Sequence, residues 1–178
     1  MRSNLAKAVK ILMTGGVIAF PTETVFGVGA SLAQPKAIAR IFKLKKRSRN
    51  KPLQVLVANL KQAKELGRFN AKALELAKKN WPGPLTLIVF KTGKVSKLVT
   101  GGSKKVGLRI PDHKIALALI KKCGPIVATS ANIAGEKPAL TSKEILLPVD
   151  HVLSGKTKIQ KASQVIDAST NKIKILRA

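Results

Sequence analysis

VIAFPTETVFGVG, residues 17–29, joins a short apolar run to a polar turn and two glycines. Four apolar residues, two of them β-branched, predict a short buried strand at 17–20. Pro21 ends that strand because its nitrogen carries no hydrogen for the strand ladder. Two hydroxyls and one carboxylate follow at 22–24, just past a strand end, where open α/β sheets bind their ligands. Taken alone, a strand followed by a polar turn is the simpler interpretation.

Outward from this stretch, helix and strand patterns alternate. The predicted helices are Asn4–Thr14 after a Ser3 cap, one that begins near Pro35, a short one after Asn59, one from Asn70 through Asn80, one capped by Asp112 and a short one capped by Ser142. The predicted strands are Leu53–Ala58, Leu85–Lys91, Val106–Ile110, Pro125–Thr129 and a hairpin of Ser163–Asp167 with Ile173–Leu176. This alternation, with a β-rich end, predicts an α/β sheet with some antiparallel pairing in one domain over residues 1–178.

The charge balance is unusual. Thirty-four Lys and Arg residues face eight Asp and Glu residues, a formal net charge of +26. A field of this size attracts polyanions such as nucleotides or RNA. The lysines are spread over the whole chain, and aromatic residues make up only 3% with no Tyr, which disfavours a base-stacking platform. The charge therefore permits RNA contact without showing it.

The sequence also indicates a cellular setting. Cys123 is the single cysteine, so neither a disulfide framework nor a thiolate zinc site is expected, and a reducing cytoplasm fits. Lys7 and Lys10 interrupt the first apolar positions, which argues against a secretory leader. No apolar run approaches the length of a membrane span, so we expect no membrane partner.

Several familiar sites are missing from the sequence. It has neither a Walker A loop nor a Gly-x-Gly-x-x-Gly fingerprint, and two histidines are too few for a histidine metal site. Polar side chains instead collect at predicted strand ends. They are Thr22, Thr24, Lys45, Arg47, Thr86, Arg109, Thr129, Ser130 and Asn132. Hydroxyls and amides that orient a ligand, with cations that neutralise it, suit a nucleoside triphosphate plus a small zwitterion. Spacing alone does not show that these groups converge.

Six motifs, in order, resemble those of the YrdC family of threonylcarbamoyl-AMP synthases. They are Phe20-Pro-Thr-Glu-Thr-Val-Phe-Gly27, Lys45-x-Arg47 with Pro52-Leu53, Trp81-Pro-Gly-Pro-Leu-Thr86, Arg109-Ile-Pro111, Thr129-Ser-Ala-Asn-Ile-Ala-Gly135, and Ser163-Gln-Val-Ile-Asp167 with Ile175-Leu-Arg177. The match covers nearly the whole chain, and the length resembles the short bacterial members. Ser48 stands where the family usually has Pro, and Ala134 replaces a common Ser, but no charged group is lost.

The resemblance implies a twisted open mixed α/β sheet with flanking helices around a basic concave cavity. It implies a nucleotidyltransferase that makes L-threonylcarbamoyladenylate and pyrophosphate from L-threonine, bicarbonate and ATP, with Mg²⁺ accompanying the ATP and no metal held by protein ligands alone. The product would feed N6-threonylcarbamoyladenosine formation at position 37 of tRNA, carried out in the cytoplasm by a TsaD-type transferase.

Residue roles also follow from the resemblance. Lys45 and Arg47 would be catalytic and hold the ATP phosphates, Thr22 would contact threonine, and Arg109 would lie near the threonine carboxylate or the phosphates. Ser130 and Asn132 would orient the nucleotide, Ser163 would reach the threonyl part, and Arg177 the nucleotide. Replacing Lys45 or Arg47 with alanine is expected to weaken ATP use strongly while leaving the fold intact.

Two other functions remain open from the sequence. The first is an RNA-binding or ribosome-maturation protein that uses the basic concave face, for which threonine would be irrelevant. The second is a carbamoyl-transfer module like that of hydrogenase-maturation carbamoyltransferases. That module is disfavoured because the chain has no acylphosphatase or cysteine-rich zinc segment.

Overall fold

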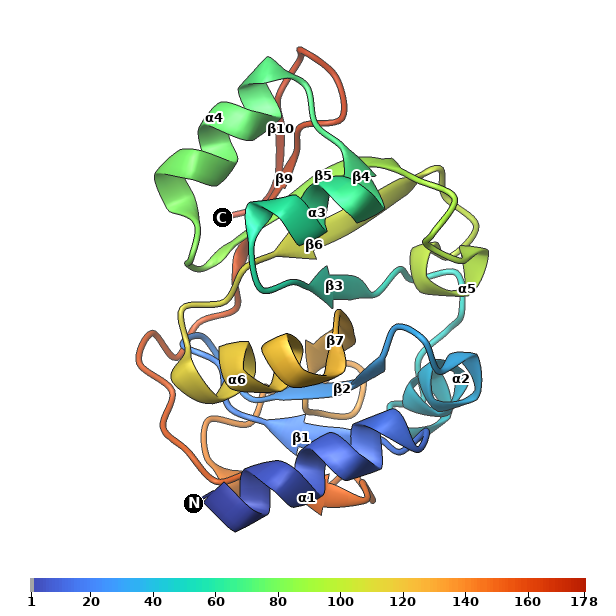
Figure 1. Cartoon of the computed structure of the whole chain (residues 1–178), viewed down its shortest axis with the longest axis vertical. Helices are drawn as coiled ribbons and strands as arrows, with labels where there is room; N and C mark the ends of the chain where they lie inside the picture. Colours follow the sequence, from blue (N-terminus) through green and yellow to red (C-terminus); the bar gives the residue numbers. More distant parts are fainter. Residues whose placement is uncertain (1) are drawn as a thin grey trace.

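The computed structural model describes residues 2–178 and contains a ten-stranded mixed sheet. The strands are β1 (Ile18–Phe20), β2 (Gly27–Ser31), β3 (Gln54–Leu56), β4 (Gly67–Arg68), β5 (Leu85–Lys91), β6 (Lys105–Arg109), β7 (Ile126–Ser130), β8 (His151–Val152), β9 (Gln164–Asp167) and β10 (Lys174–Arg177). Their order is β10-β9-β5-β6-β3-β7-β2-β1-β8, with β4 paired to β5. The β1/β8, β3/β6 and β5/β9 pairs are parallel and the others antiparallel. The two ends of this order do not pair, which confirms the predicted open mixed sheet (Figure 1).

The helices largely follow the predicted pattern. They are α1 (Arg2–Met13), α2 (Pro35–Leu44), α3 (Leu60–Leu66), α4 (Ala71–Asn80), α5 (Lys97–Thr100) and α6 (Lys114–Cys123), with a 3-10 turn at Ser142–Glu144. The predicted Asn59 and Asn70 caps are confirmed, because their side chains accept backbone N–H groups at 2.9 and 2.8 Å.

Three other predicted caps are wrong. Ser3 lies inside α1, and Ser142 lies inside the 3-10 turn after Thr141. Asp112 stands one residue too early, because His113 is still extended at φ −142° and α6 begins after it. A polar residue near a helix start is a cap only when its own backbone is extended there.

β2 was not predicted, although it pairs with both β1 and β7. Its sequence, GVGAS, is small and has weak strand propensity. Gly29 is required by a close approach, since a Cβ there would lie 2.8 Å from Ile126 Cγ2 and 3.0 Å from Phe20 Cε1. The glycines of the opening stretch therefore let neighbouring strands carry large side chains.

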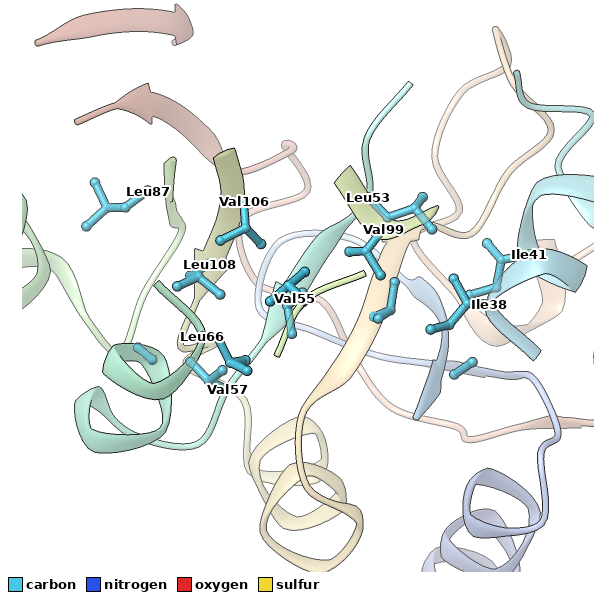
Figure 2. Close-up of a cluster of buried hydrophobic side chains, with 14 of the residues drawn as sticks. Ile38, Ile41, Leu53, Val55, Val57, Leu66, Leu87, Val99, Val106 and Leu108 are labelled. Carbon is cyan, nitrogen blue, oxygen red and sulfur yellow. The ribbon is translucent and has the colours of Figure 1, made fainter. Parts of the chain in front are cut away.

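One face of the sheet carries the main hydrophobic core. Strand register places a continuous apolar row across it: Ala30, Val127, Val55, Leu108, Leu87 and Ile166. Figure 2 shows Val55 between the β6 side chains and Ile38 and Ile41 of α2. Because side chains alternate along a strand, the residues between these positions must point to the opposite face.

That opposite face is covered over only part of its width. Leu12 of α1 and Leu119 of α6 belong to a second buried cluster, over Phe20, Leu56 and Ile126. Across β3, β6, β5 and β9 the same face continues as Gln54, Gly107, Ile88 and Asp167, which lie in register. This strip is where the candidate site is found.

No helix within residues 2–178 combines the length and the apolar character needed to cross a bilayer.

Candidate active site

A cavity of about 350 Å³ lies over this strip of the sheet. Gln54, Gly107, Ile88 and Asp167 form its floor, one from each of four adjacent strands. Gly107 adds no side chain to this floor, and a Cβ there would lie 3.2 Å from the Thr86 methyl carbon. The remaining lining residues are Arg47, Pro52, Leu53, Thr86, Ser103, Lys105, Ala128, Thr129, Val165, Leu176 and Arg177.

The cavity is cationic. Arg47, Lys105 and Arg177 line it, and Asp167 is the one carboxylate among its lining residues. Burial lowers the pKa of Arg47, and burial together with the neighbouring Arg109 lowers the pKa of Arg177. Crowded, partly buried cations of this kind favour a ligand with negative charge.

Asp167 neutralises only part of the positive charge of the cavity. Its Oδ2 accepts a hydrogen bond from Lys105 Nζ at 2.7 Å, and its Oδ1 accepts the Ser169 N–H at 3.0 Å. Burial alone would raise the pKa of Asp167, but these hydrogen bonds hold it below its ordinary value. The carboxylate is therefore ionised and already paired, and it leaves Arg47 and Arg177 to meet a ligand.

Two of the predicted site residues, Arg47 and Arg177, reach the cavity directly. Arg47 follows the end of α2, and its Nη2 donates to the Pro52 carbonyl at 3.0 Å. Arg177 lies on the edge strand β10, and its Nε donates to the Ser163 carbonyl at 2.8 Å. Ser163 is buried beneath it, and its Oγ accepts from Arg177 Nη2 at 3.2 Å. The structure thus brings Arg47, Arg177 and Ser163 to one place from widely separated parts of the chain.

Lys45, Ser130 and Asn132 form a second group. Lys45 is 1% exposed, and its ammonium donates to the Ser130 carbonyl at 2.5 Å and to the Asn132 carbonyl. The Asn132 amide in turn donates to the Glu136 carbonyl at 2.8 Å. None of the three lines the cavity, but Thr129, which precedes Ser130, does. In this arrangement Lys45 ties the end of α2 to the end of β7.

Burial, reinforced by Arg47 and opposed by Glu136, lowers the pKa of Lys45 from 10.5 to about 8. Between about pH 8 and 10.5, Lys45 is therefore more protonated in the unfolded chain than in the folded protein. Its contribution to the free energy of unfolding rises with pH over this range. In a carbon-13 lysine NMR titration, the resonance that disappears in Lys45→Met should titrate near pH 8 in the wild type. A midpoint at the ordinary value of 10.5 would contradict this.

Thr22 and Arg109 form a third group, which is buried between loops. Thr22 Oγ1 donates to the Val25 carbonyl at 2.7 Å and lies 2.8 Å from Thr24 Oγ1. Arg109 Nη2 donates to Thr24 Oγ1 at 3.0 Å, and its Nε donates to the Gly83 carbonyl at 3.2 Å. Neither Thr22 nor Arg109 lines the cavity.

Arg109 is also paired with Glu23, a contact that the sequence did not predict. Arg109 Nη2 lies 2.6 Å from Glu23 Oε1, and both side chains are at most 3% exposed. The contact is an ion pair, and neither Glu23 oxygen has a hydrogen-bond partner among residues 2–178. The pair links the turn after β1 to β6 in the protein interior.

Thr86 and Thr129, two of the polar residues predicted at strand ends, also line the cavity. Four polar cavity residues were absent from that prediction: Gln54, Ser103, Lys105 and Asp167. Thr129 and Asp167 lay inside recognised motifs without an assigned role. Gln54 and Lys105 carried no motif, and only the strand register places them on the cavity face. Among the described residues, no group of three or more His, Cys, Asp or Glu side chains could hold a metal ion.

With this geometry in view, comparisons place the chain among known proteins. A profile of the Sua5/YciO/YrdC family, described as telomere recombination, matches residues 10–178. The chain belongs to this family. A Psychromonas ingrahamii member of the Sua5/YciO/YrdC family, named threonylcarbamoyl-AMP synthase, is 36% identical in an alignment of 188 positions that covers 96% of this chain and 95% of that protein. The family predicted from the six motifs is confirmed.

Other relatives in the Sua5/YciO/YrdC family are longer. A Bacillus subtilis (strain 168) protein named threonylcarbamoyl-AMP synthase is 43% identical in an alignment of 155 positions that covers 85% of this chain and 44% of that protein. A Pyrococcus abyssi protein with the same name is 40% identical, with 90% of this chain matching 49% of its length. The chain therefore spans about half the length of these two relatives.

Solved structures agree with the family assignment. Pyrococcus abyssi Sua5 complexed with L-threonine aligns with a TM-score of 0.93 at 36% identity, over 97% of this chain and 53% of that chain. Escherichia coli YciO aligns with a TM-score of 0.90 at 26% identity, over 99% and 89% of the two chains. Full-length HypF, at 21% identity and a TM-score of 0.84 over 98% of this chain and 28% of its own, shares the fold alone.

Proposed function

We propose that this protein is a threonylcarbamoyl-AMP synthase, a nucleotidyltransferase that joins L-threonine, bicarbonate and ATP with release of pyrophosphate. The observation that carries the proposal is a cationic cavity, lined by Arg47, Lys105 and Arg177, in a chain that matches a relative of this name over nearly its whole length. The solved structure of a Sua5 complexed with L-threonine supports L-threonine as a substrate.

The proposed chemistry asks the protein for positioning and charge neutralisation. The threonine amine combines with bicarbonate to form a carbamate and water. A carbamate oxygen then attacks the α-phosphorus of ATP, and the bond to the bridging oxygen of pyrophosphate breaks. Arg47 and Arg177 would offset the charge that builds on the phosphates. Enclosure in the cavity would also slow the hydrolysis of the carbamate and of the mixed anhydride.

The remaining predicted roles are part of this proposal. Lys45 would act at the phosphates together with Arg47, and Ser130 and Asn132 would orient the nucleotide beside Thr129. Ser163 would contact the threonyl part from beneath Arg177. For Thr22 and Arg109, the hydrogen bonds to protein atoms support a role in fixing the loops. The contact of Thr22 with threonine, and of Arg109 with the threonine carboxylate or the phosphates, stays a prediction.

ATP would be used as its Mg²⁺ complex. Mg²⁺ prefers oxygen ligands and is commonly held by one or two carboxylates plus substrate phosphates. Both oxygens of Asp167, the cavity carboxylate, are already hydrogen-bonded to Lys105 and Ser169. The ion would therefore arrive with the ATP phosphates, where it would neutralise charge.

The wider setting is also proposed. The adenylate would be consumed in the cytoplasm by a TsaD-type transferase that modifies tRNA position 37. The net charge of +26 is compatible with tRNA contact.

The proposal is tested by pyrophosphate release from ATP by the purified protein with Mg²⁺ present. Release should require both L-threonine and bicarbonate, because the carbamate is the attacking group. Release that continues without threonine would contradict the proposal. A folded protein that binds RNA but releases no pyrophosphate would favour the RNA-binding alternative.

A further inference from the structure

Gln54 lies on the cavity floor, and no motif or comparison assigns it a role. It is half-buried on β3, between Gly107 of β6 and Ala128 of β7 in the strand register. Both neighbours are small, so the Gln54 side chain is the polar group that rises from this part of the floor. Its position is therefore suited to contact a bound ligand.

A chain of hydrogen bonds holds one end of the Gln54 amide. Thr86 Oγ1 donates to Gln54 Oε1 at 2.8 Å, and Thr86 Oγ1 lies 3.0 Å from Ser163 Oγ. Thr86 has one hydroxyl proton, which goes to Gln54, so Ser163 must donate to Thr86. Ser163 Oγ in turn accepts from Arg177, which has only donors. The Thr86 proton on Gln54 Oε1 therefore sets the direction of the chain, and the Arg177 donor to Ser163 is compatible with it.

This direction leaves Gln54 Nε2 without a partner among residues 2–178. Its two N–H groups belong to a side chain that lines the cavity, beside cations. We propose that Gln54 is a specificity-determining residue, whose Nε2 donates to an anionic oxygen of the substrate, either a carboxylate or a phosphate oxygen. This inference rests on the function proposed above. Thr86 is the positioning residue, because it fixes which end of the amide faces the ligand.

The test compares Gln54→Met and Gln54→Glu with a matched control, Gln164→Met. Gln164 is also a half-buried glutamine of the same sheet, but it lies outside the cavity lining and makes no side-chain hydrogen bond. For each protein, KM is measured for ATP and for threonine by pyrophosphate release. Binding of ATP and of threonine is measured separately by calorimetry, which does not depend on turnover.

Loss of a hydrogen bond to a charged oxygen predicts that Gln54→Met raises KM and Kd for one substrate about 10- to 100-fold. A rise in KM and Kd for threonine would identify the threonine carboxylate as the group that Gln54 contacts. A rise for ATP would identify a phosphate. Gln54→Glu should weaken the same substrate further, because it places a negative charge against an anion. Gln164→Met should match the wild type.

Wild-type constants for both substrates in Gln54→Met, or tighter binding in Gln54→Glu, would overturn the inference. If the wild type releases no pyrophosphate, the proposed function fails, and the calorimetric constants alone decide on Gln54. Thr86→Val adds a second line of evidence that does not alter Gln54 itself. In the double variant, the losses of binding free energy caused by Thr86→Val and Gln54→Met should add up to less than their sum. Fully additive losses would contradict the positioning role of Thr86.

Discussion

Replacing Arg47 with alanine is expected to lower kcat/KM for ATP about 100-fold or more, with little change in the free energy of unfolding. Loss of one charged donor at a site of developing charge typically costs this much in rate. Arg47 lines the cavity, and its hydrogen bonds go to the carbonyls of Lys51 and Pro52 in its own exposed loop. Its removal therefore takes charge from the cavity without leaving a polar group unpaired in the interior.

The matched control for Arg47 is Arg49→Ala. Arg49 belongs to the same basic loop and carries the same charge, but its side chain is exposed and lies outside the cavity lining. Its removal should leave kcat/KM for ATP unchanged within error. Equal losses in the two variants would mean that the general charge of the loop matters and that Arg47 has no specific role.

Replacing Arg109 with methionine is expected to lower the free energy of unfolding by about 3–5 kcal/mol, the cost typical of breaking a buried ion pair. Glu23 would stay in the interior without its cationic partner and with no hydrogen-bond partner among the described residues. Thr24 Oγ1 and the Gly83 carbonyl would also each lose a donor. Urea unfolding of the wild type and the variant measures the difference.

Two further variants show whether the pair itself is responsible. Lys105→Met breaks the Lys105–Asp167 pair, whose side chains are 36% and 19% exposed, and should cost about 1 kcal/mol or less. Adding Glu23→Leu to Arg109→Met removes the isolated charge and should recover part of the lost stability. If Arg109→Met costs no more than Lys105→Met, the buried pair does not stabilise the fold as described.

The sequence predicted the elements whose signals are local. Leu85–Lys91 has the predicted bounds because a long β-branched and aromatic run follows a Pro-Gly-Pro break, and Asn59 and Asn70 cap helices as expected. β2 was missed because Gly27–Ser31 forms a strand through its neighbours, which pack large side chains over its glycines. Such a strand depends on tertiary context that propensity does not contain.

The site residues that lie in sequence motifs were predicted. Those whose place on the cavity face depends on strand register were missed. Arg47 and Arg177 were found because each belongs to an ordered motif. Gln54 and Lys105 could not be found, since a one-residue change of register would move either side chain to the other face. A sequence also does not say which buried cation meets a protein partner, as Arg109 meets Glu23.

For Lys45 the structure leads to a different prediction from the one made on the sequence. Its replacement by alanine was expected to leave the fold intact, but its ammonium is buried and serves the Ser130 and Asn132 carbonyls. Without Lys45, these acceptors lose a charged donor that joins α2 to β7. Arg47 therefore separates effects on ATP from effects on stability more cleanly than Lys45 does.

The most direct measurement for the proposed function is mass spectrometry of the product formed from ATP, L-threonine and carbon-13 bicarbonate. We predict a threonylcarbamoyl adenylate that carries the label in its carbamoyl carbon and forms together with pyrophosphate. An adenylate of threonine that contains no bicarbonate carbon, or no adenylate from a folded protein, would contradict the proposed function.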